Sequence, residues 1–111
     1  MAIARLSPRE QGIVLCCMKA TAAYIDDSEK YSRLGIEADV LSRLIDEWPN
    51  IYDHDEDGNG FLAVNNCFNE VCHGFKIEAA DWKDWFDCPK IEVESTYRKW
   101  RSLSGTSGGI R

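Results

Sequence analysis

Ser7-Pro8-Arg9-Glu10 begins the stretch SPREQGIVLCCMKATAAY, residues 7–24, which carries the clearest structural signal in the chain. Ser7 is a good helix cap, Pro8 suits the first helical turn, and Glu10 completes a capping box. Apolar residues then recur at steps of three and four, at Ile13, Cys17, Ala20 and Tyr24, with Val14 and Met18 widening the stripe. The stretch predicts an amphipathic helix from Pro8 to Tyr24 that buries one face.

Further helical segments follow this one, and no stretch alternates in the manner of a strand. Asp27 or Ser28 is expected to cap a short helix that ends at Gly35, and Pro49 ends a helix over 36–48. Later helices are expected over 61–73 and 92–103, with a short helix or turn over 79–87. The prediction is an all-α fold, a compact single-domain bundle of about five helices over residues 1–104, followed by a flexible tail over 105–111.

The composition excludes several classes of protein. The chain has 111 residues, 44% of them hydrophobic and 11% aromatic, which is enough for one core and argues against disorder. The longest apolar run, 13–18, is too short to span a bilayer. Because no signal peptide is evident, we expect a cytoplasmic protein, no membrane partner, and five reduced cysteines with a structural role.

Charge is distributed unevenly along the chain. Residues 1–94 carry nineteen acidic and nine basic side chains, a net charge of -10, whereas residues 95–111 carry four basic side chains and no acidic one. The negative body disfavours nucleic acid and favours basic proteins or cations as partners. A DNA-binding adaptor that uses Arg98, Lys99 and Arg101 in the last helix remains an alternative.

The most acidic stretch covers the end of the third expected helix and the loop before the fourth. Residues 46–57 contain six acids and neither lysine nor arginine. Such a density of like charge repels itself unless something positive compensates it. Three asparagines, Asn65, Asn66 and Asn69, follow on the next helix and are expected either to pin this loop by hydrogen bonds or to face a partner.

Residues 55–66 resemble the twelve-residue EF-hand calcium loop, without its final glutamate. Asp55, Asp57 and Asn59 match positions one, three and five, and Gly60 matches the glycine at six. The resemblance implies Ca²⁺ as a bound ion, with ligands from Asp55, Asp57, Asn59 and the carbonyl of Phe61. Asn66 occupies the twelfth position, and Pro49 interrupts the helix that would lead into the loop. The alternative is a solvated acidic loop in which Asp57 or Asn59 caps the following helix.

Aromatic residues crowd the short element over 79–87. Trp82, Trp85 and Phe86 alternate there with aspartates. Three aromatic rings are hard to bury completely in so small a domain, so the element serves either as a lid on the core or as an anchor for a cationic partner.

No arrangement in the sequence supports catalysis. The only histidines are His54, which lies among carboxylates, and His73, whose neighbour Cys72 points about 100° away on a helix. Neither a phosphate-binding glycine loop nor a zinc-protease pattern occurs. The sequence therefore predicts no enzyme and no catalytic residue.

The segment from Trp48-Pro49 through the acidic loop to 63–70 loosely resembles small, uncharacterised bacterial helical proteins of the toxin-immunity type. That resemblance implies an inhibitor that docks on and blocks a basic partner such as a toxin or nuclease. The residues expected to bind it are Asp46, Glu47, Asp53, Asp55, Glu56, Asp57, Trp82 and Trp85.

Overall fold

The structure is a computed structural model, and it describes residues 2–53, 55 and 57–104. The predicted tail over 105–111 lies outside these residues. All regular elements among the described residues are helices. The described part of the chain has one 3-10 helix and six α-helices, against the expected number of about five. They are η1 (Ile3–Arg5), α1 (Pro8–Tyr24), α2 (Asp27–Leu34), α3 (Ala38–Asp46), α4 (Asn59–His73), α5 (Ala79–Trp85) and α6 (Lys90–Ser104).

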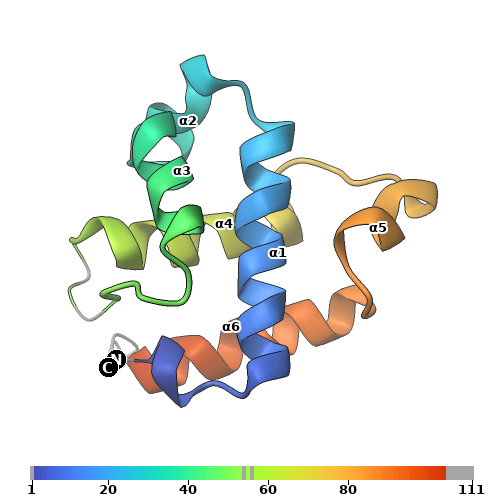
Figure 1. Ribbon diagram of the computed structural model, residues 1–111. Coiled ribbons are helices and arrows are strands. Elements are labelled where there is room, and N and C mark those ends of the chain that lie inside the picture. The colour runs from blue at the N-terminus through green and yellow to red at the C-terminus, as the bar shows by residue number, and fades with distance from the viewer. Residues whose placement is uncertain (1, 54, 56, 105–111) are drawn as a thin grey trace.

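Helix α1 forms as its capping box predicts. The hydroxyl of Ser7 accepts a hydrogen bond from the backbone N–H of Glu10 at 3.1 Å, and the Glu10 carboxylate accepts one from the N–H of Ser7 at 2.8 Å. The helix runs through the middle of the molecule, with α4 and α6 packed across it (Figure 1). It therefore touches most of the other elements and organises the core.

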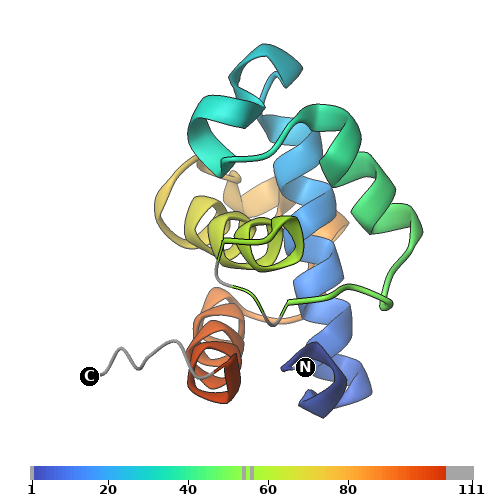
Figure 2. The same ribbon diagram turned by 90° about the vertical axis from the view of Figure 1, so that its left-hand side faces the viewer.

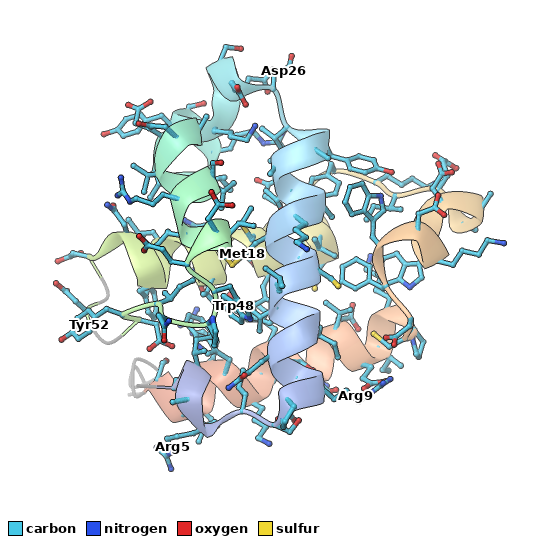
Figure 3. The ribbon with its side chains drawn as sticks, in the orientation of Figure 1. Arg5, Arg9, Met18, Asp26, Trp48 and Tyr52 are labelled. Atoms are coloured by element: carbon cyan, nitrogen blue, oxygen red, sulfur yellow. The ribbon has the colours of Figure 1, made fainter. Side chains whose placement is uncertain are left out.

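The core lies where α1, α4 and α6 meet. Met18 is completely buried and points from α1 into the interior (Figure 3). Phe68 of α4 and Trp100 of α6 are also completely buried, and their rings lie 6.3 Å apart. Full burial of such a side chain contributes about 2 kcal/mol relative to exposure, so this trio of helices holds the domain together.

Helices α2 and α3 pack together beside α1 (Figure 2). Gly35 ends α2 with a φ of 78°, the left-handed conformation that glycine adopts most readily. Several helix boundaries differ from the sequence analysis by one or two residues. Asp26 precedes α2, without a side-chain cap, and α3 ends at Asp46, two residues before Trp48. The residue before a proline is pushed out of helical geometry, and here the helix stops earlier still.

No described helix is both long enough and apolar enough to cross a membrane.

Candidate functional site

Exposed carboxylates gather at the end of α3 and in the loop that follows it. Asp46 is the last residue of α3, Glu47 is next to it, and Asp55 and Asp57 lie just before α4. All four are exposed. The loop is shaped by Asp55, whose carboxylate accepts the N–H of Asp57 at 3.1 Å and whose carbonyl accepts the N–H of Gly58 at 2.8 Å. Tyr52 projects outward from the same loop (Figure 3).

The same side of the molecule carries two further acids near the start of α3. Glu37 and Asp39 are exposed and border a hollow of about 560 Å³ between α2 and α3. Together the six exposed carboxylates define what we call the acidic side: Glu37, Asp39, Asp46, Glu47, Asp55 and Asp57. The sequence analysis missed Glu37 and Asp39 because it followed an unbroken acidic run, whereas the fold brings the start of α3 onto the same side.

Charge along the chain supports this grouping. Residues 26–58 carry eleven acidic and three basic side chains, a net charge of -8, whereas all other residues carry eight acidic and ten basic ones, a net charge of +2. The segment comprises α2, α3 and the loop, which lie together on one side of α1 (Figures 1 and 2). Most of the net negative charge of the chain therefore falls in this segment.

Within the described residues, the acidic side takes part in no ion pair. The strongest pairs lie elsewhere: Arg9 with Glu92 at 2.6 Å and Lys99 with Glu10 at 2.9 Å join α1 to α6, and Arg33 with Glu70 joins α2 to α4. The hydrogen bond from Arg9 lowers the pKa of Glu92, and the one from Lys99 lowers the pKa of Glu10. These pairs hold helices together, and none of them involves the acidic side.

Asp53 does not lie on the exposed acidic surface where the sequence analysis placed it. Its side chain is only 1% exposed. One carboxylate oxygen, Oδ2, accepts the N–H of Ile3 at 3.0 Å and the indole Nε1–H of Trp100 at 2.9 Å. Buried N–H groups need an acceptor, and Asp53 supplies one to η1, through Ile3, and to α6, through Trp100. It is a structural residue. Glu56 and His54 lie outside the described residues.

Trp82 and Trp85 lie far from the acidic side, which corrects the expectation that all eight residues share one surface. Both belong to α5, which lies on the opposite side of α1 (Figure 1). Both are half-buried. Trp82 stacks on Phe86 at 4.5 Å, and Trp85 meets the ring of Tyr24 edge-on at 5.9 Å. They cover the outside of α1 and do not extend the acidic side.

The helix geometry departs from a calcium loop. Helix α4 begins at Asn59, so the carbonyl of Phe61 points along the helix and takes part in its hydrogen bonding. Among the described residues, no three side chains of histidine, cysteine, aspartate or glutamate gather closely enough to hold a metal ion. The cap also differs: Gly58 precedes α4, in place of the expected Asp57 or Asn59.

A second register of the calcium pattern escaped the sequence analysis. Asp53, Asp55, Asp57 and Gly58 match its first, third, fifth and sixth positions. The inward direction of Asp53, which binds Ile3 and Trp100, separates it from the two exposed carboxylates.

Lys99 and Arg101 of the basic last helix are engaged within the fold, whereas Arg98 is exposed. Lys99 pairs with Glu10, and Arg101 donates to the amide oxygen of Asn65 at 2.9 Å. Tyr97 donates to the same oxygen at 2.7 Å. Asn65 therefore joins α4 to α6, and Asn66 donates to the carbonyl of Leu34 at 2.7 Å. These two asparagines have structural roles, but neither pins the acidic loop, and Asn69 is exposed.

All five cysteines are free thiols. Cys16 is half-buried and the other four are buried. Burial raises the pKa of Cys67 to about 12 and raises the pKa of Cys17 well above its ordinary value. Buried cysteines of this kind pack as small apolar residues and are unreactive.

These thiols make the fold sensitive to alkali. The Cys67 thiol loses its proton near pH 9 in the unfolded chain and near pH 12 in the native state. The contribution of the neutral thiol to the free energy of unfolding is therefore complete below pH 9, and it is lost as the pH rises from 9 to 12. We expect Cys67 alone to remove about 1 kcal/mol of stability between pH 7.5 and pH 10. Urea unfolding at both pH values, with a phosphine reductant, measures the loss. Cys67→Ala retains every lysine and tyrosine and should show a shallower fall, and equal falls in both proteins contradict the assignment.

No family model, curated protein or solved structure matches the chain.

Proposed function

We propose that the protein is a non-catalytic binding protein whose acidic side docks on a basic surface of a partner protein and blocks it. The observation that carries the proposal is the set of six exposed carboxylates on one side that have no ion-pair partner among the described residues. Like charges held close together destabilise the compact state, so their grouping calls for a compensating positive partner.

Physical chemistry favours association through such a surface. Exposed charges add little to stability one by one, but a concentrated field of one sign speeds the encounter with an oppositely charged protein and rejects partners of like sign. The two ends of α3 and the loop before α4 present carboxylates over an extended area, which suits a protein surface better than a small cation.

The kind of partner follows from the same charge. A toxin or nuclease that acts on nucleic acid needs a basic active site for phosphate groups. A carboxylate-rich surface competes for that site and excludes the substrate. This is the role that the loose resemblance to bacterial immunity proteins implies, and a cytoplasmic inhibitor of a basic toxin or nuclease is the function that we propose.

Charge reversal on the acidic side tests the proposal. We expect the variant with Asp46→Lys, Glu47→Lys, Asp55→Lys and Asp57→Lys to bind the partner at least about tenfold more weakly and to lose most of the salt dependence of binding. The immobilised wild-type chain captures partner proteins from the cells that express it. The affinity of a captured basic protein is then measured for each variant at low and moderate salt.

The matched control reverses four exposed acids on the other side of the molecule: Glu78, Asp81, Asp84 and Asp87. It changes the net charge equally and should bind within about threefold of wild type at moderate salt, where long-range effects are screened. A partner that binds the first variant as tightly as wild type contradicts the proposal. A partner that binds the first variant but not the control also contradicts the proposal, because that result places the interface on α5.

A further inference from the structure

Two adjoining hollows surround Trp82 at the far end of α4 from the acidic side. One, of about 430 Å³, is lined by Lys76, Ile77, Ala79, Trp82, Pro89 and Lys90. The other, of about 330 Å³, shares four of these residues and continues to the C-terminal end of α4 around His73. We call the two together the Trp82 groove.

The floor of the groove is apolar and already in place. The indole N–H of Trp82 donates to the carbonyl of Cys88 at 2.7 Å, and the ring stacks on Phe86. These contacts fix the orientation of a half-buried ring before any ligand arrives. A rigid aromatic ring that loses little entropy on binding is a typical anchor point of an interface.

The rim of the groove is positive. Lys76 and Lys90 are exposed, line both hollows, and make no ion pair with any described residue. No acidic side chain lines either hollow, although the chain carries a net charge of -6. Two exposed lysines that make no ion pair with a described residue, set beside an apolar floor, complement a ligand that is both anionic and apolar.

The helix dipole explains only part of this charge. A cation near the C-terminal end of a helix is favourable, which accounts for Lys76, three residues beyond the end of α4. Lys90 is the first residue of α6, and a cation at the N-terminal end of a helix is unfavourable. The helix dipole therefore gives no reason for Lys90, whereas an anionic ligand in the groove does.

We propose that the Trp82 groove binds an acidic peptide segment of a protein, with an apolar side chain of the peptide packed against Trp82 and its carboxylates beside Lys76 and Lys90. Both hollows are open, as suits a segment of chain lying across the surface. The groove and the acidic side lie at opposite ends of α4, about 22 Å apart along a helix of 15 residues. The protein then has two binding surfaces of opposite charge preference, and the second does not depend on the first.

A titration with a short peptide tests the groove. The probe is the acetylated, amidated peptide Asp-Glu-Phe-Asp-Glu, added to the ¹⁵N-labelled full chain at millimolar concentrations. We expect chemical-shift changes at the amides of residues 71–79 and of Lys90, and at the indole N–H of Trp82. In Lys76→Glu and Lys90→Glu the peptide should bind about tenfold more weakly, because a favourable charge becomes a repulsive one. Lys19→Glu, an exposed lysine of α1 outside the groove, should bind as wild type does.

Peptide controls separate the proposed mode from simple attraction between charges. The analogue with alanine in place of phenylalanine should bind much more weakly, and the analogue with lysine at all four acidic positions should not shift the groove. Four results each overturn the proposal. The alanine analogue binds as tightly as the phenylalanine peptide, or the phenylalanine peptide binds Lys90→Glu as tightly as wild type. Alternatively, the peptide shifts no resonance, or it shifts only resonances of other elements.

Discussion

Replacing Asp53 with alanine should destabilise the fold by about 3 kcal/mol, because two buried N–H groups lose their acceptor at once. The donors are the backbone of Ile3 and the indole of Trp100, at 3.0 and 2.9 Å from the same carboxylate oxygen. The affected atoms are buried, so water cannot replace the lost acceptor without opening the structure. Urea unfolding followed by tryptophan fluorescence measures the change, and the indole N–H resonance of Trp100 should shift in the NMR spectrum of the variant.

Two controls isolate the carboxylate of Asp53. Asp53→Asn keeps one oxygen as acceptor for both donors and should cost about 1 kcal/mol. Asp55→Ala removes an exposed aspartate from the same loop and should change stability by no more than about 0.5 kcal/mol. If Asp53→Ala unfolds at the same urea concentration as Asp55→Ala, the carboxylate does not hold the loop to the two ends of the chain.

Asp53 also shows where sequence reasoning about the site fails. The six acids of residues 46–57 look equivalent in the sequence, and nothing local distinguishes the one that turns inward. Its partners lie 50 and 47 residues away, near the two ends of the described chain. Only the packing of η1 and α6 beside the loop creates two donors that need an acceptor. Charged side chains usually stay in contact with water, and this preference predicts the exposure of the other described acids of this stretch, Asp46, Glu47, Asp55 and Asp57.

Helix α1 shows the opposite case. Its capping box and its three-and-four spacing are local, and both bounds of the helix agree with the prediction. The left-handed Gly35 is local too. No local signal in the sequence predicts the side of the molecule on which α5 lies, because that side depends on the path of the connection over 74–78. The tryptophans could therefore be recognised as an aromatic cluster from the sequence, but their distance from the acidic side could not.

Replacing Gly60 with alanine should destabilise the fold by about 3 kcal/mol, the upper range for overpacking. The sequence analysis assigned this glycine to the sharp turn of a calcium loop, but it lies in the first turn of α4 with a negative φ. A Cβ atom there would overlap the carbonyl oxygen of Tyr52 and would lie 2.7 Å from Cγ2 of Ile51. Backbone cannot move aside as the end of a flexible side chain can. Because Ile51 is 1% exposed, the segment that carries Asp53 would have to shift as a whole.

Gly12→Ala is the matched control, since it makes the same change in another helix. Nothing lies within 4 Å of a Cβ atom built on Gly12. The new methyl group should therefore stabilise α1 by about 0.5 to 1 kcal/mol, through the ordinary helix preference for alanine over glycine. Opposite signs in urea unfolding are the expected result. If the two substitutions change the free energy of unfolding equally, the loop over 47–58 moves aside for the new methyl group on α4. The acidic side then lacks the rigid support that close packing at Gly60 and the hydrogen bonds of Asp53 give it.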